Sequence, residues 1–230
     1  MMPYDLTNTN DLIDNPSPRC PCMVVLDTSG SMSSGGFFSS GPSPIDQLNE
    51  GFQKFLESLR ADEVAAYSVE VGVITAGGSV REALPFTTAH AIESFQPLVA
   101  GGETPLGGAV TLALRRLEER KTEYKRNGVP YYQPWLVVIS DGEPTDAWQQ
   151  AAQEAKSQSE SRKLVSLMVG VKSADMDKLG QFSSKPALKL DGLKFSEFFE
   201  WLSASMSRVS SSSSTSALVH LPATDSWASI

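Results

Sequence analysis

The chain has 230 residues, of which 40% are hydrophobic and 20% are charged, and its formal net charge is −8. This composition is typical of a globular protein and unlike that of a disordered or fibrous chain. The net charge argues against binding to nucleic acid, which requires clustered basic residues to neutralise phosphates. In the basic stretch "LRRLEERKTEYKR" acids alternate with bases, which predicts a solvated helix face.

The N-terminal residues 1–19 are polar and acidic, and we expect them to form a leader outside the folded domain. They lack the basic and apolar regions of a secretory signal. No apolar run approaches the ~20 residues needed to span a bilayer, so we expect a cytoplasmic protein without membrane contact. Cys20 and Cys22 are too few ligands for a structural zinc site, and a disulfide between them would be strained.

Apolar runs that read as buried strands alternate along the chain with segments of helical periodicity. A strand at Cys22–Leu26 is followed by a Gly/Ser-rich loop and by a helix that Ser43 caps, with Pro44 at its first position. The remaining predicted elements are, in order, a strand at 67–78, its antiparallel partner at 79–87 joined through Gly77-Gly78, a helix from Leu106, a strand at 134–140, a helix through Lys156 capped by Asp146 with Gln149, a strand at 163–171, a short helix at Met176–Leu179, a weak strand at 187–190 and a helix from Phe195 to Val209.

This alternation predicts an α/β fold with a Rossmann-like, mostly parallel central sheet, one antiparallel edge strand, and helices on both faces. We place the folded domain at residues 20–209. Residues 210–230 would form a Ser-rich linker and a C-terminal tail. We expect the tail to pack on the end of the body away from the carboxyl ends of the strands, through Leu218, Val219, Leu221 and Trp227.

Oxygen-bearing side chains follow several of the predicted strands directly. Asp27 ends the first strand in "VVLDTSGSM", which also supplies Ser29 and Ser31, and Asp141 ends another strand in "VISDGEPTDAW". Thr104 precedes a helix in "GGETPLGGAV". In open parallel sheets, ligands bind beyond the carboxyl ends of the strands. Each residue alone is more typical of a turn or a helix cap, but their coincidence at one edge predicts a site.

The five residues offer two carboxylates and three hydroxyls, without a thiolate or an imidazole. Hard oxygen donors of this kind suit a small hard cation such as Mg²⁺ or Mn²⁺. The sequence therefore predicts a divalent metal site formed by Asp27, Ser29, Ser31, Thr104 and Asp141.

The three motifs, "DTSGSM", "GGETPLGGAV" and "VISDGEPTDAW", resemble the metal-ion-dependent adhesion site (MIDAS) of von Willebrand factor type A (VWA) domains. The resemblance extends from about Cys20 to Val209. Further stretches, including "RCPCMVVLDTSGSM" and "LKFSEFFEWLSASM", resemble the bacterial tellurium-resistance (TerY-like) subgroup.

The resemblance implies a protein-binding module rather than an enzyme. Ser29 and Ser31 would bind the metal directly, Thr104 directly or through water, and Asp27 and Asp141 directly or by accepting from metal-bound water. A metal held largely by neutral hydroxyls would attract an Asp or Glu of a protein partner. The subgroup implies a role in a bacterial tellurium-resistance or stress-response system.

Two alternatives remain open from the sequence. Asp27 at the end of the first strand could instead be the nucleophile of a Mg²⁺-dependent aspartyl-phosphate phosphohydrolase, although Ser29 occupies the position where that chemistry needs a second carboxylate. Phe37 and Phe38, in a loop longer than usual for the family, could pack against the following helix or form an apolar contact surface beside the metal.

Overall fold

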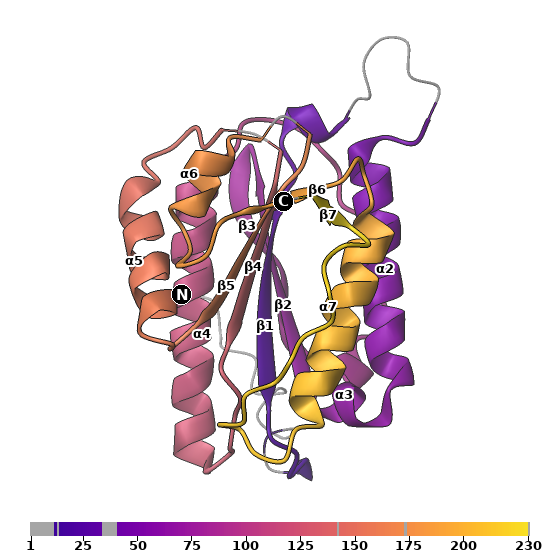
Figure 1. Cartoon of the computed structure of the whole chain (residues 1–230), viewed down its shortest axis with the longest axis vertical. Coiled ribbons are helices and arrows are strands. Elements are labelled where there is room, and N and C mark those ends of the chain that lie inside the picture. Colours follow the sequence, from indigo (N-terminus) through magenta and orange to yellow (C-terminus); the bar gives the residue numbers. More distant parts are fainter. Residues whose placement is uncertain (1–11, 13, 34–40, 142, 173, 230) are drawn as a thin grey trace.

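The computed structural model describes the chain except for residues 1–11, 13, 34–40, 142, 173 and 230. It contains a seven-stranded sheet in the order β3-β2-β1-β4-β5-β6-β7, with helices on both faces (Figure 1). The pairs from β2 to β6 are parallel, and β3 pairs with β2 in the antiparallel direction. The predicted fold class is confirmed. A second antiparallel edge strand, β7, was not predicted.

The strands lie close to the predicted segments, with differences of one or two residues at their ends. Gly78, between β2 and β3, has a φ of 62°, which makes the tight hairpin connection possible. The strands are β1 (Cys20–Asp27), β2 (Val69–Gly77), β3 (Ser79–Thr88), β4 (Trp135–Ser140), β5 (Val165–Gly170), β6 (Leu188–Leu190) and β7 (Ala228–Ser229).

The helices divide between the two faces of the sheet (Figure 1). One face is covered by α2 (Pro44–Ala61), α3 (Glu63–Ser68) and α7 (Phe195–Ser210), and the other by α4 (Leu106–Asn127), α5 (Gln149–Glu160) and α6 (Met176–Gly180). Ser43 caps α2 as predicted, in a capping box with Asp46. Within the described part of the chain, none of the helices combines the length and apolar character needed to cross a membrane.

Strand β1 lies inside the sheet between β2 and β4, and all eight of its residues are buried. Alternate side chains enter opposite cores, because successive residues of a strand point to opposite faces. Val24 and Leu26 face α2 and α7, whereas Met23 and Val25 face α4 and α5. Burial on both faces explains the near-continuous apolar sequence of this strand.

The two cysteines share one face of β1 and are buried there as free thiols. Cys20 Sγ lies 3.8 Å from Met206 Sδ in α7. Burial, aided by the charge of Glu70, raises the pKa of Cys20 to about 12, and burial raises that of Cys22 well above its ordinary value. Because the thiolate is the reactive form, both residues contribute to the core as small apolar side chains.

Val219 of the C-terminal tail is partly buried against the core, but the end of the tail does not pack where we expected it. After α7 it runs back along that helix toward the edge of the sheet where β1 ends, and β7 pairs with β6 there (Figure 1). Trp227 is fully buried, with its ring centre 4.9 Å from that of Phe198 and 5.3 Å from that of Trp201. Leu218 is 93% exposed. Phe198 and Trp201 both lie in the first half of α7. The prediction that Trp227 packs on the end of the body away from the carboxyl ends of the strands is therefore wrong.

Part of the predicted solvated face of α4 is also buried. Arg120 donates two hydrogen bonds to Glu70 of β2, at 2.6 and 2.8 Å, and Tyr124 Oη donates to the same carboxylate at 2.5 Å. Arg19 Nε lies 3.1 Å from Glu70 Oε1. Alternating charges along a helical sequence do not show which of its side chains contact a buried carboxylate on another element. The prediction of a solvated face is therefore wrong for Arg120 and Tyr124.

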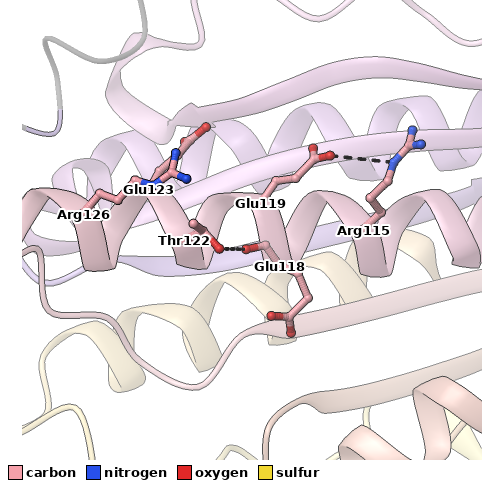
Figure 2. A pocket seen from close by; sticks show the side chains of 6 residues that line it. All are labelled: Arg115, Glu118, Glu119, Thr122, Glu123 and Arg126. Atoms are coloured by element: carbon pink, nitrogen blue, oxygen red, sulfur yellow. Dashed lines mark hydrogen bonds and ion pairs between the residues drawn. The ribbon is translucent and has the colours of Figure 1, made fainter.

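The outer side of α4 does carry the predicted solvated charges. Figure 2 shows a shallow pocket on this helix, in the half farther from the end of β1, lined by Arg115, Glu118, Glu119, Thr122, Glu123 and Arg126. Arg115 pairs with Glu119 one turn away, at 3.8 Å. Exposed pairs of this kind contribute about 0.2–1 kcal/mol each, and this surface is an ordinary charged helix face.

Because Trp227 is buried, we expect the tail to contribute to the free energy of unfolding of the domain. We expect Trp227→Ala to lower the free energy of unfolding by about 3–5 kcal/mol, because it leaves a large cavity beside Phe198 and Trp201. Leu218→Ala, in the same tail but exposed, should change it by less than about 0.5 kcal/mol. Denaturant unfolding of the two variants measures both values. Equal effects would show that Trp227 does not pack on α7.

Candidate metal centre

Two adjacent parallel strands bring Asp27 and Asp141 to the same edge of the sheet. Leu26 of β1 pairs with Ile139 of β4, so the residues that follow on each strand leave the sheet side by side. Asp27 is fully buried and Asp141 is 6% exposed. The predicted proximity of the two carboxylates follows from this register.

Both oxygens of Asp27 accept hydrogen bonds. The Ser29 amide donates to Oδ1 at 2.8 Å, and the Ser140 hydroxyl donates to Oδ2 at 2.6 Å. Burial raises the pKa of Asp27 above its ordinary value of 3.8; the hydrogen bonds from Ser140 and Ser29 oppose this rise, and the charge of Asp141 adds to it. Ser140 was not predicted as part of the site, although its position directly before Asp141 at a strand end was a usable signal.

The serine hydroxyls connect the first loop to Asp141. After β1 the chain forms a short 3-10 turn, η2 (Gly30–Ser33). Ser29 Oγ lies 2.8 Å from Ser31 Oγ, and the Ser31 hydroxyl donates to Asp141 Oδ1 at 2.7 Å. Ser29 is buried, whereas Ser31 is exposed. Four of the five predicted residues therefore form one hydrogen-bonded group at the edge of the sheet, with its outer side open to solvent.

Thr104, the fifth predicted residue, is held beside this group by backbone contacts of its loop. Gly30 donates its amide proton to the carbonyl of Gly102 at 2.9 Å, and the Thr145 amide donates to the carbonyl of Thr104 at 2.9 Å. Thr104 is 5% exposed. Gly102 has a φ of 75°, and a Cβ atom there would lie 2.4 Å from the Cα of Gly78, so the loop requires glycine.

Asp146 has a different role from the one we predicted. The sequence indicates a capping box for α5, but Trp148 is the N-cap of that helix and makes no side-chain cap. The carboxylate of Asp146 instead accepts from the amides of Gly107 and Gly108, at 2.9 and 2.7 Å, in the first turn of α4. Asp146 thereby attaches the loop that follows β4 to the helix that follows Thr104.

Lys172 is a further residue of the site that sequence reasoning missed. Its ammonium donates to the carbonyl of Ser31 at 2.6 Å and lies 3.3 Å from Asp141 Oδ2. That carboxylate oxygen is buried and has no hydrogen-bond partner among the described residues, so the contact with Lys172 is an ion pair without hydrogen-bond geometry. A lysine two residues beyond a strand gave little sequence signal, because such residues are usually solvated.

The residues at this edge fit a divalent cation. The donors are carboxylate and hydroxyl oxygens, and Asp141 Oδ2 is a buried oxygen that accepts no hydrogen bond from the part of the chain that the structure describes. In the described part of the chain, no group of three or more His, Cys, Asp or Glu side chains offers another metal centre. A metal here would therefore depend on the serine and threonine hydroxyls together with the two aspartates.

The family model for the von Willebrand factor type A domain matches residues 23–200, which include all five predicted ligands. The chain belongs to the VWA domain family. No curated protein matches it significantly. The tellurium-resistance subgroup therefore rests on the resemblance of sequence motifs alone.

Solved VWA-like structures share the fold at low sequence identity. A VWA protein from Catenulispora acidiphila superimposes with a TM-score of 0.60 at 14% identity, covering 83% of this chain and 43% of the other. The D319A mutant of the PilB minor pilin from Streptococcus sanguinis gives 0.59 at 11% identity, covering 84% and 63%.

Mussel proximal thread matrix protein 1, with a zinc-occupied MIDAS motif, gives a TM-score of 0.56 at 14% identity and covers 83% of this chain and 48% of that one. This VWA chain thus spans 43% to 63% of the length of these structures. A MIDAS-type site in a protein of this fold can hold a divalent metal. Phe37 and Phe38 lie outside the described residues, and both hypotheses for them stay predictions.

The raised pKa of Asp27 predicts a pH dependence of stability in metal-free buffer. At pH values below 3.8, the ordinary pKa of an aspartate, protonated Asp27 contributes its full stabilisation of the fold. This contribution is lost as the pH rises through the higher pKa that Asp27 has in the folded state. Asp27→Asn stays neutral and keeps an oxygen for the Ser29 amide. With EDTA, the variant should gain stability relative to the natural protein as the pH rises from about 4 to about 7.

Asp46→Asn provides a control of opposite sign. Hydrogen bonds with Ser43 lower the pKa of Asp46, so its contribution is present at neutral pH and lost as the pH falls through the lowered value. Asp46→Asn should therefore be less stable than the natural protein at neutral pH. Urea unfolding at a series of pH values tests both variants, and parallel curves for Asp27→Asn and the natural protein would contradict the prediction.

Proposed function

We propose that this VWA domain is a metal-dependent protein-binding module that recruits its partner through an acidic side chain. The main support is the hydrogen-bonded group formed by Asp27, Ser29, Ser31 and Asp141, with Thr104 on the adjoining loop. These side chains belong to three separate segments and converge at one edge of the sheet. A structural role alone would not require hydroxyl and carboxylate groups from all three.

Mg²⁺ or Mn²⁺ is the metal that this donor set favours, because both prefer hard oxygen ligands. Ser29 and Ser31 would contribute their hydroxyls, and Asp141 its Oδ2 atom. Asp27 already accepts one hydrogen bond at each oxygen, which favours a role in orienting Ser29 and accepting from metal-bound water. When bound, the metal would supply a concentrated positive charge at the edge of the sheet.

An acidic partner follows from the charge of the ligands. Hydroxyl ligands are neutral and reduce the charge of a divalent ion less than carboxylates do. Ser31 is exposed, so the outer side of the site is accessible to a partner. A carboxylate from an Asp or Glu is the hard anionic ligand that would complete such a site.

The phosphohydrolase alternative has weaker support. A nucleophilic carboxylate must reach a phosphorus atom, but Asp27 is fully buried and both of its oxygens accept hydrogen bonds. Ser29 cannot act as the second carboxylate of that chemistry. We therefore propose a binding role without catalysis, and we expect no Mg²⁺-dependent hydrolysis of an aryl phosphate.

The biological setting is part of the proposal and rests on the sequence motifs. The likeness to the TerY-like subgroup supports a bacterial tellurium-resistance or stress-response system. The two free, buried thiols are compatible with the reducing cytoplasm. The net charge of −8 supports a protein partner rather than nucleic acid.

Alanine variants at the hydroxyl ligands test the proposal. Ser29→Ala should weaken Mg²⁺ or Mn²⁺ binding by about tenfold or more, as expected for the loss of a charge-assisted contact, and should weaken partner capture with it. Thr104→Ala should weaken partner capture more than metal binding. The measurements are calorimetric metal titrations and pull-downs in Mg²⁺ or in EDTA.

Ser33→Ala is the matched control, because Ser33 is a neighbouring serine whose hydroxyl contacts the carbonyl of Gly30 and none of the five ligands. A soluble peptide rich in Asp and Glu should compete with the partner for the metal centre, whereas its Asn and Gln counterpart should not. Partner capture that persists in EDTA, or that Ser29→Ala leaves unchanged, would refute the proposal.

A further inference from the structure

The backbone after β5 directs Lys172 toward the metal centre. Strand β5 is the neighbour of β4, and the Val171 amide donates to the carbonyl of Ser140 at 3.0 Å, which extends the pairing to the end of β4. Lys172 then adopts a φ of 54°, in the left-handed region that non-glycine residues seldom occupy. The backbone thus adopts an unfavourable conformation at the residue whose side chain reaches the site.

The Lys172 ammonium contacts two segments of the candidate metal centre at once. It donates to the backbone carbonyl of Ser31 at 2.6 Å and lies 3.3 Å from Asp141 Oδ2. Asp141 Oδ2 is the carboxylate oxygen that has no hydrogen bond from the described residues, and it is the oxygen that would be free to bind a metal. Lysine and metal therefore compete for the same atom.

Charge favours this position for the lysine in the absence of metal. Asp27 and Asp141 are both buried at this edge of the sheet, and like charges this close together repel. Among the described residues, Lys172 supplies the ion pair to this pair of carboxylates. Its side chain is 30% exposed, so the ammonium could move into solvent without unfolding the loop.

We propose that Lys172 is a tethered counter-cation that neutralises Asp141 in the metal-free state and that a divalent ion must displace. This inference rests on the proposed metal binding and adds that Lys172 sets the affinity of the site for the metal. The lysine keeps the metal-free site folded and at the same time weakens metal binding. The free energy of breaking the ion pair is subtracted from that of binding the metal.

A second lysine on the same segment provides a matched control. Lys178 pairs with Glu143 at 3.0 Å and with Asp175 at 3.3 Å, and neither carboxylate is a predicted ligand. Lys178→Gln removes the same charge from α6, a short distance further along the chain, without removing a competitor for Asp141. Lys172→Gln retains a donor for the Ser31 carbonyl, and Lys172→Arg retains the charge.

Calorimetric titration with Mg²⁺ and with Mn²⁺ separates these effects. We expect Lys172→Gln to lower the dissociation constant by about tenfold, a typical coupling between two ligands of one site, and Lys172→Arg and Lys178→Gln to stay within about threefold of the natural protein. In EDTA, Lys172→Gln should melt at a lower temperature than the natural protein, and added Mg²⁺ should raise its melting temperature by more. Lys172→Met, which removes both the charge and the donor, provides a second neutral variant if Lys172→Gln folds poorly.

The outcomes distinguish this inference from the proposed function. If the natural protein and Lys172→Gln bind metal equally, or if the variant binds more weakly, the counter-cation is refuted while metal binding stands. If neither binds metal, both proposals fail. If only Lys172→Gln binds, or if it binds more tightly than Lys178→Gln, displacement of the lysine is supported.

Discussion

The repulsion between Asp27 and Asp141 is the constraint on which the site depends. Parallel pairing of β1 with β4 places the two residues side by side, and the cores on both faces of the sheet keep them there. The surrounding groups all reduce the cost of this arrangement: the hydroxyls of Ser140 and Ser31 donate to the carboxylates, and an ammonium lies against Asp141. A sheet edge that needs positive charge is a natural place to bind a cation.

The loops around the site approach one another through their backbones, and glycine permits this. A Cβ atom on Gly77 would lie 2.2 Å from Thr28 Oγ1, and one on Gly107 would lie 2.5 Å from the Cα of Trp148. Side chains at these positions would separate the loop of Ser29 from the hairpin, or the helix after Thr104 from the loop after Asp141. The position of the ligands is therefore determined by contacts that a ligand motif does not describe.

A buried carboxylate also lies at the opposite end of the sheet, and there side chains of the protein alone neutralise it. Glu70 is fully buried between two arginines, and Tyr124 donates to the same carboxylate. Burial by itself would lower the pKa of Arg120, but its hydrogen bonds and its pairing with Glu70 raise it. Here the positive charges that neutralise the buried acid are two arginines of the chain itself, which stay charged. At the metal centre, by contrast, a soluble ion would replace the ammonium of Lys172.

The sequence by itself determined the fold class, the motif residues and the order of the elements other than α3 and β7, because buried parallel strands and amphipathic helices have distinct periodicities. It placed Asp27 and Asp141 on one edge because parallel strands share a direction. Only the tertiary structure decided which side chains complete the site and how the tail docks. Lys172, Ser140 and Asp146 act on residues distant in sequence, and Trp227 is buried by α7. Such contacts depend on how separate elements pack in space, and local patterns along a single chain do not encode them.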